Sequence, residues 1–253
     1  MVKLRPFSRM WQLEREVSGH PRLVPLIGYS FDGPWMFLVA EFMPNDSLGN
    51  HLFKATKRKT MEWSMRLRVA YYIAEALEYC INEGRALYFD LNPNKVLFDE
   101  AGNPCLSCFG LVKNHRDARC YSTNIAYRPP LSTVGLITCE SMIYSFGLLL
   151  RDLLTGKQIS EEQALDISLG KKLPMLLDPR LMGKYPRNQS SDVVLLAEHC
   201  MQYDPGNRPT IQEVVAALAQ VLSDDVGPSP TIKGDSKKPI KFSCFPSGRK
   251  RDN

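Results

Sequence analysis

The chain has 253 residues, with 44% hydrophobic and 23% charged residues, which is ordinary for a globular protein of one large domain or two small ones. Its formal net charge is +5, but seven Lys or Arg and two Asp lie from Lys233 onward, so the rest of the chain is close to neutral. Without a basic stripe on the folded part, we expect no nucleic-acid partner.

The N-terminal half shows short strand signals followed by a long helix. Strands are expected at residues 23–29 and 36–41, which are apolar runs on either side of an Asp-Gly-Pro turn signal. Residues 45–47 should cap a short helix that holds Leu48 and Leu52. Apolar residues at three- and four-residue steps predict a long helix over about 64–82, ended at Gly84.

Short strands and further helices follow. We expect strands at 86–88, 96–98 and 104–107, helices at 141–154 and 191–201, and a last helix at 210–222 with Pro209 at its first turn. Because the helix at 141–154 is apolar all round, it should lie in the middle of a domain. After Leu222 the sequence loses periodicity, and a disordered tail is expected.

The cysteines predict an intracellular protein with free thiols. There are seven, an odd and scattered set, and the chain shows no signal peptide and no apolar run long enough for a membrane span. Cys105 and Cys108 are spaced as C-x-x-C, but no second Cys or His pair accompanies them. Residues three apart on a strand also face opposite sides, so we interpret this spacing as coincidence.

Two neighbouring motifs have the outline of kinase chemistry. Residues 88–95, Tyr-Phe-Asp-Leu-Asn-Pro-Asn-Lys, follow the catalytic-loop pattern H-R-D-L-x-x-x-N. Residues 106–110, Leu-Ser-Cys-Phe-Gly, stand where a protein kinase has Asp-Phe-Gly, whose aspartate holds the magnesium that bridges the nucleotide phosphates. The thiol of Cys108 is a poor ligand for a hard cation that prefers oxygen.

Further motifs extend the resemblance over roughly residues 1–222. Residues 38–45 resemble the hinge of a plant receptor-like kinase, 144–147 the start of the central helix of the large lobe, and 207–210 the Arg-Pro that closes that lobe. The departures at 85–92, 106–111 and 140–147 resemble the brassinosteroid-signalling kinases. These plant receptor-like cytoplasmic kinases are widely regarded as pseudokinases, or very weak kinases, that act as scaffolds beneath membrane receptor kinases.

The resemblance implies an α+β, protein-kinase-like fold with a mainly helical large lobe and an incomplete small β lobe. Its domains would be a partial N-lobe at 1–41, a C-lobe at 42–222 and a basic tail at 223–253. Lys3 would be the strand lysine that contacts the nucleotide phosphates, and Glu14 or Glu16 its helix partner. The chain would then start at that strand, without the two strands and the glycine-rich loop that precede it.

The resemblance also assigns the remaining cleft residues. Asp90 matches the catalytic aspartate, and it is interpreted either as a proton acceptor or as a vestige retained for hydrogen bonding within the loop. The second metal ligand, an asparagine, is replaced by Lys95, with Asn94 one place early. Because Cys108 replaces the first ligand, no metal site is expected.

The adenine would be framed by the hinge backbone from Glu41 to Met43 and by Leu97 below it. Ala40 falls at the gatekeeper position, where a small residue would open an apolar pocket. Ordinary strand packing explains that alanine equally well. No cofactor is required, and any binding of ATP is expected to be weak.

Three further positions depart from the kinase pattern. Phe89 replaces the arginine that grips an activation-loop phosphate, and Met142 stands where an aspartate anchors the catalytic loop. Leu131 replaces the glutamate that pairs with the buried arginine, here Arg208. Because an unpaired buried guanidinium is costly, Arg208 must find another acceptor or solvent. Ser122 or Thr123 is a candidate phosphoacceptor, with a plain polar loop as the alternative.

Three hypotheses of function follow. The first is a signalling scaffold or adaptor that acts downstream of plant receptor kinases, with little or no phosphoryl transfer. The second is a weak serine/threonine kinase that uses Lys3 and Asp90 with ATP. The third is a partial product that does not fold alone, because its small lobe would expose a sheet edge.

The scaffold hypothesis places the chain in brassinosteroid signalling, with receptor-like kinases and other signalling proteins as its partners. Family members usually begin with a Met-Gly myristoylation signal and end with tetratricopeptide helices, whereas this chain begins Met1-Val2 and shows no helical repeat after Leu222. The basic tail around Cys244 is either solvated or weakly attracted to an anionic membrane. We therefore expect a cytoplasmic protein with at most weak, peripheral association with the plasma membrane.

Overall fold

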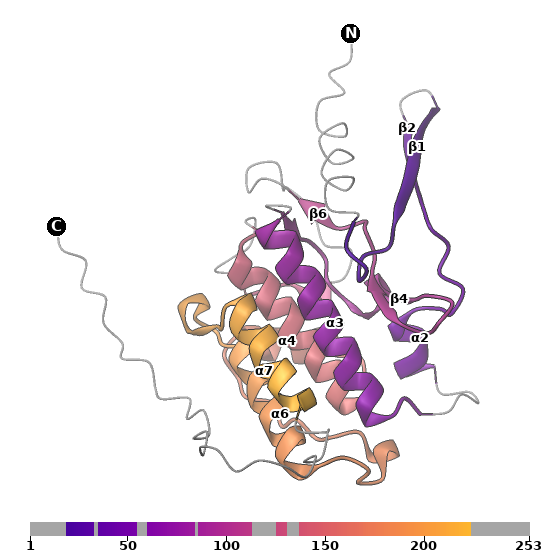
Figure 1. The fold of residues 1–253 in the computed structure, drawn as a ribbon. Helices are drawn as coiled ribbons and strands as arrows, with labels where there is room; N and C mark the ends of the chain where they lie inside the picture. The colour runs from indigo at the N-terminus through magenta and orange to yellow at the C-terminus, as the bar shows by residue number, and fades with distance from the viewer. Residues whose placement is uncertain are drawn as a thin grey trace, which may run out of the picture.

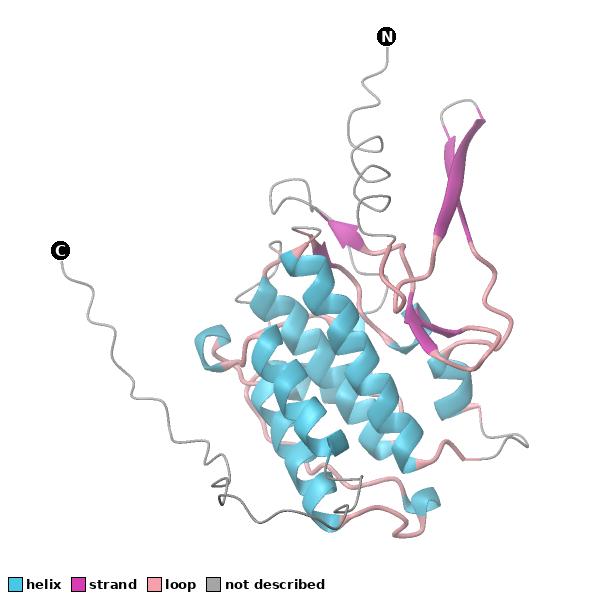
Figure 2. Ribbon diagram, viewed as in Figure 1, coloured by secondary structure: helices cyan, strands magenta, loops and turns pink. Residues whose placement is uncertain are grey.

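The computed structural model describes residues 19–32, 35–54, 60–83, 86–112, 125–130 and 137–223. Some predictions fall outside this part of the chain, namely those on Lys3, Glu14, Glu16, Ser122, Thr123, Leu131 and the tail. The body of the described part is a bundle of helices (Figures 1 and 2), and its long members are α3 (Trp63–Asn82), α4 (Cys139–Thr155), α6 (Arg187–Cys200) and α7 (Ile211–Ser223).

The strands of the described part form three separate antiparallel pairs. They are β1 (Leu26–Asp32) with β2 (Trp35–Ala40), β3 (Leu87–Tyr88) with β6 (Leu111–Val112), and β4 (Val96–Phe98) with β5 (Pro104–Leu106). The β1–β2 hairpin projects away from the helices, whereas β4 lies beside the short helix α2 (Leu48–Phe53) (Figure 1). Helix α5 (Glu161–Ser168) and the 3₁₀ turns η1 (Pro93–Lys95), η2 (Ile125–Tyr127), η4 (Pro179–Leu181) and η5 (Pro205–Asn207) complete the order.

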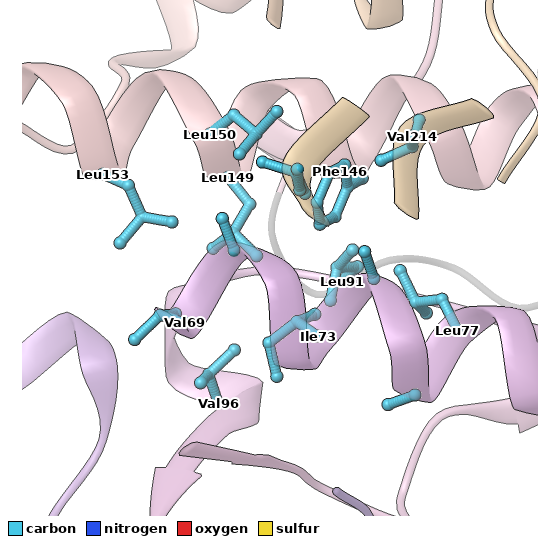
Figure 3. Packing of buried hydrophobic residues seen from close by; sticks show 14 of the residues in the cluster. Val69, Ile73, Leu77, Leu91, Val96, Phe146, Leu149, Leu150, Leu153 and Val214 are labelled. Atoms are coloured by element: carbon cyan, nitrogen blue, oxygen red, sulfur yellow. The ribbon is translucent and has the colours of Figure 1, made fainter. Parts of the chain in front are cut away.

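The core lies between α3 and α4, as the apolar patterns predict. The buried face of α3 includes Val69, Ile73 and Leu77, which belong to the same buried cluster as Phe146 and Leu149 of α4 (Figure 3). Every side chain of α4 from 141 to 155 is buried, so this helix lies in the middle of the domain as expected. Helix α3 also packs against α7, and α4 packs against α6.

Side-chain caps explain where α2 and α4 begin. The Ser47 hydroxyl accepts a hydrogen bond from the Asn50 backbone N–H at 3.4 Å and caps α2, as predicted. Thr138 and Ser141 form a reciprocal capping box at the start of α4. Helix α4 ends at Thr155, and Gly156 caps it with a φ of 64°, a left-handed conformation that favours glycine.

Several predicted boundaries were wrong. Strand β1 begins at Leu26 rather than at residue 23, because Leu23 instead forms a parallel bridge with Leu106 of β5. Helix α6 begins at Arg187, four positions before the predicted residue 191, where a preceding proline allows an early start. Helix α7 begins at Ile211, so Pro209 precedes the helix, and Thr210 and Glu213 cap it reciprocally.

At Gly147, α4 packs tightly against the C-terminal end of α6, and we expect Gly147→Ala to destabilise the fold. An added Cβ would lie 2.7 Å from Cys200 Cβ and 2.7 Å from Met201 Cγ, so the two helices would have to separate. Overpacking of this kind costs about 1–3 kcal/mol, and the better helix propensity of alanine offsets up to about 1 kcal/mol. Urea unfolding should therefore show a net loss of roughly 1–2 kcal/mol.

The matched control for this substitution is Gly28→Ala in β1, where an added Cβ meets nothing within 4 Å. Its free energy of unfolding should stay within about 0.5 kcal/mol of the unmodified protein. Equal losses in the two variants would mean that the α4–α6 contact is not tight at Gly147.

Candidate functional site

The catalytic-loop residues connect β3 to η1 in a tightly hydrogen-bonded turn. Asp90 has a φ of 59°, a left-handed conformation that is uncommon for a residue other than glycine. The buried side chain of Asn92 holds this turn, since its amide donates to the Asp90 carbonyl oxygen at 2.7 Å. The Asn92 side-chain oxygen accepts from the Asn94 backbone N–H at 3.0 Å. Asp90 itself is half-buried.

Tyr88 attaches the Ser-Cys-Phe-Gly segment to this loop. Its hydroxyl donates to the Ser107 carbonyl oxygen at 2.8 Å, and the Phe89 backbone N–H donates to the Gly110 carbonyl oxygen at 2.6 Å. Burial raises the pKa of Tyr88 well above its ordinary value, so the hydroxyl remains a neutral donor. Gly110 fits because it has no side chain, since an added Cβ would lie 2.5 Å from the Tyr88 ring.

The side chains that stand at the metal-ligand positions lie in three different surroundings. Cys108 is 2% exposed and belongs to the buried residues of the fold. Asn94 places its side-chain oxygen against α2, where a Cβ on Gly49 would come within 2.4 Å of it. The Lys95 ammonium donates to the Phe109 carbonyl oxygen at 3.4 Å, so it lies beside the segment that carries Cys108.

These residues do not fit a magnesium ion. Magnesium prefers oxygen ligands in octahedral geometry, whereas the two positions offer a buried thiol and an ammonium group. Within the described ranges, no group of three or more His, Cys, Asp or Glu side chains is arranged to hold a metal ion.

Of the predicted adenine-framing residues, Glu41 and Met43 lie just after β2, and Leu97 lies on β4. The Glu41 backbone N–H donates to the Pro25 carbonyl oxygen at 2.9 Å, so this donor is used within the fold. Glu41 is exposed, whereas Met43 and Leu97 are half-buried. Leu97 pairs with Cys105 across β4 and β5. The proposed roles of these residues toward adenine, and that of Lys3, remain predictions.

Arg208 finds backbone acceptors in place of a glutamate. Arg208 is 7% exposed, and its Nε donates to the Gln202 carbonyl oxygen at 2.8 Å. Its Nη1 and Nη2 donate to the carbonyl oxygens of Glu140 at 2.8 Å and Tyr203 at 3.1 Å. The guanidinium carbon also lies 4.9 Å from the Tyr144 ring centroid. The expectation that Arg208 needs another acceptor is therefore confirmed.

We expect Arg208→Met to lower the free energy of unfolding by about 2–3 kcal/mol. The apolar part of the side chain is kept, but three carbonyl oxygens in this region lose a charged donor. Chemical denaturation measures the loss, and Arg208→Lys is the control because it keeps the charge and one or two of the hydrogen bonds. An Arg208→Met variant as stable as the unmodified protein would show that solvent replaces the guanidinium at no cost.

A second buried network was not predicted from the sequence. Asp152 of α4 is 0% exposed, and it accepts a hydrogen bond from the Tyr127 hydroxyl and another from the Ile159 backbone N–H at 3.1 Å. Arg151 Nη1 lies 3.8 Å from Asp152 Oδ1. The signal in the sequence was the charged pair Arg151 and Asp152 inside a largely apolar helix, which indicates buried polar contacts. This carboxyl group therefore links α4 to η2, which precedes it in the chain and contains Tyr127, and to the segment that follows it and contains Ile159.

The sequence matches the protein kinase domain family over residues 7–218, which is most of the chain. The chain therefore belongs to the protein kinase domain family, and the expected α+β kinase fold is confirmed. Its described helices include no segment that is long and apolar enough to cross a membrane.

Among kinases, the chain is a homologue of the BSK serine/threonine-protein kinases, as the motifs predicted. It is 52% identical over 248 residues to serine/threonine-protein kinase BSK1 of Arabidopsis thaliana. The matched region covers 94% of this chain and 48% of that protein. It is 50% identical over 219 residues to BSK1-2 of Oryza sativa subsp. japonica, covering 86% and 42%, respectively. The chain thus spans about half the length of the curated relatives it matches.

Proposed function

We propose that this protein is a kinase-like scaffold that acts downstream of plant receptor kinases in brassinosteroid signalling, with little or no phosphoryl transfer. One observation carries the proposal: the residue at the first metal-ligand position, Cys108, is a thiol that is 2% exposed. Phosphoryl transfer depends on metal ions and on electrostatic stabilisation, and removing a single such contact typically slows an enzyme by about 10²–10³. The ammonium of Lys95 at the second position adds to this loss.

A weak serine/threonine kinase is the alternative, and two observations favour it. Asp90 is retained, in a left-handed turn that Asn92 holds in place. The relatives of the chain are also named serine/threonine-protein kinases. In this alternative, Asp90 accepts the substrate hydroxyl proton and Lys3 contacts the phosphates. Ser122 and Thr123, the candidate phosphoacceptors, are compatible with both functions.

Radiolabelled phosphate transfer separates the two functions. We expect the unmodified protein and Asp90→Asn to label a general kinase substrate equally, at the background level, because neither holds the metal that the reaction needs. Both proteins should bind the cytoplasmic domain of a brassinosteroid receptor kinase with the same affinity in a pull-down or by calorimetry. Transfer by the unmodified protein that Asp90→Asn abolishes would sink the scaffold proposal as a complete account.

A further inference from the structure

An apolar stripe on α5 lies open to solvent. Leu165 and Leu169 stand four residues apart, so they lie on one side of this helix, and they are 55% and 58% exposed. The ring of Tyr203, which is 53% exposed, borders them, since a Cβ added to Gly170 would lie 4.0 Å from its Cδ2 atom. An exposed apolar patch of this kind, when polar residues border it, is typical of an interaction site.

The opposite side of α5 already has its contacts. Ala164 and Ile167 are each 7% exposed and belong to a buried cluster with Tyr127 and Leu148. These residues attach the helix to the rest of the domain. The two leucines of the stripe take no part in that cluster, so the packing of the described residues gives no reason for apolar side chains at their positions.

Two glutamates extend the stripe at the start of α5. Glu161 and Glu162 precede Leu165 by four and three residues, so they lie on the same side of the helix, and both are exposed. Among the described residues, neither forms an ion pair. Lys171, which follows the stripe, lies 2.7 Å from Asp166, and its charge is compensated there. The stripe therefore has a net negative charge. We call its residues the α5 face, namely Glu161, Glu162, Leu165, Leu169 and Tyr203.

The C-terminal part of the chain has the complementary chemistry. Residues 237–245 read Lys-Lys-Pro-Ile-Lys-Phe-Ser-Cys-Phe, with three lysines and three large apolar residues, Ile240, Phe242 and Phe245. No acidic residue interrupts this segment. Burial of the two aromatic rings is favourable, and the lysines find opposite charges at the two glutamates. The segment therefore matches the α5 face both in its apolar residues and in its charge.

The chain between α7 and this segment is long enough for the segment to reach the α5 face. Helix α7 ends at Ser223, and residues 224–236 separate it from Lys237. At about 3.3 Å per residue, these thirteen residues span up to about 43 Å, whereas α3, with 20 residues, is about 30 Å long. A tether of this length also holds the segment at an effective concentration on the order of millimolar, so even a weak contact is populated.

We propose that residues 237–245 dock on the α5 face of their own chain. The apolar residues Ile240, Phe242 and Phe245 cover the two leucines and Tyr203, and the lysines lie beside the glutamates. The docked segment shields the α5 face, so a protein partner that binds there has to displace it. The α5 face shares no residue with the cleft, so this inference goes beyond the proposed scaffold function and does not depend on it.

Disulfide trapping with the native thiol of Cys244 tests the proposal in the full chain. We expect Leu169→Cys to form a link to Cys244 under mild oxidation with copper–phenanthroline, and peptide mass spectrometry after digestion without reductant identifies this link. Leu195→Cys is the matched control, because Leu195 is an exposed leucine of α6 outside the α5 face. The link should form about tenfold faster in Leu169→Cys, since docking raises the local concentration of the Cys244 thiol there. Leu165→Cys provides a second position on the α5 face.

Further substitutions in the trapping variant separate the contribution of charge from that of apolar contact. Glu161→Gln and Glu162→Gln together should slow the trapping about threefold to tenfold, and high salt should slow it as well. Phe242→Ala and Phe245→Ala together should reduce the trapping to the rate of the α6 control, because the apolar contact is lost. Glu198→Gln changes an exposed glutamate of α6 and should leave the rate unchanged.

Three outcomes would overturn the proposal: equal trapping rates in Leu169→Cys and Leu195→Cys, trapping that the two phenylalanine substitutions leave unchanged, or links that form only between two chains. The last outcome would mean that the segment docks on a second copy, and the rate of trapping would then rise with protein concentration. None of these outcomes affects the phosphate-transfer experiment. The scaffold function and the docking of residues 237–245 can therefore fail separately.

Discussion

Replacing Asp178 with asparagine should lower the free energy of unfolding by about 3–5 kcal/mol, the usual cost of breaking a buried ion pair by removing one partner. Asp178 Oδ2 lies 2.6 Å from Arg66 Nη2, and the two side chains are 1% and 2% exposed. Arg66 lies on α3 and Asp178 precedes η4, so the pair joins the helix bundle to the segment that follows α5.

The loss should be large because the guanidinium of Arg66 stays charged. Burial lowers its pKa, but arginine is not deprotonated in proteins. Burial alone would raise the pKa of Asp178, and hydrogen bonds from Arg180 and Arg66 hold it below its ordinary value. Because the folded-state pKa of Asp178 is lowered, its stabilising contribution is present at neutral pH and is lost as the pH falls through that pKa.

A surface pair of similar geometry provides the control. Lys171 Nζ lies 2.7 Å from Asp166 Oδ1, but the side chains are 62% and 37% exposed. Asp166→Asn should change the free energy of unfolding by less than about 1 kcal/mol. Chemical denaturation at pH 7 gives the free energy of unfolding of Asp178→Asn and of Asp166→Asn. Small losses of similar size in the two variants would mean that water replaces the missing interaction at Arg66. The double variant Arg66→Met/Asp178→Asn should lose less than the sum of its single changes.

The long elements were predictable because their signals are local. The apolar spacing of α3 and the continuous apolar run of α4 located both helices within a few residues. Helix α5 was missed because it is short and mostly polar, although Ser160 and Gln163, which form its capping box, are a recognisable start signal. Strand β6 was also missed, because a strand of two residues has no detectable periodicity. Its pairing with β3, which lies more than twenty residues earlier in the chain, depends on tertiary structure.

The motif order located the candidate site, but it did not predict the contacts within it. The positions of Asp90, Lys95 and Cys108 followed from their order along the chain, whereas the bond from Lys95 to the Phe109 carbonyl oxygen depends on tertiary structure. The need of Arg208 for an acceptor was predictable because a buried charge must be compensated. The identity of its acceptors was not, since they are backbone carbonyl oxygens that any sequence supplies.

Asp152→Asn should become more stable relative to the unmodified protein as the pH rises from 4 to 7. Burial raises the pKa of Asp152 to about 7 from its ordinary value of 3.8, although hydrogen bonds from Tyr127 and Ile159 and the charge of Arg151 act in the opposite direction. Between these two pH values, the unfolded chain releases the Asp152 proton while the folded chain retains it. The folded state therefore loses stability as the pH rises, by up to about 4 kcal/mol for a shift of this size.

Urea unfolding of both proteins between pH 4 and pH 8 measures this effect, and the difference between their profiles isolates Asp152 from Asp178, which is present in both. Asparagine removes the charge and keeps an oxygen that accepts from the Ile159 N–H. The difference should increase up to about pH 7 and stay constant above it. Tyr127→Phe removes a donor to the carboxylate, so it should move the loss of stability to higher pH. Parallel profiles for the unmodified protein and Asp152→Asn would show that the buried carboxyl group is ionised throughout, with Tyr127, Ile159 and Arg151 compensating its charge.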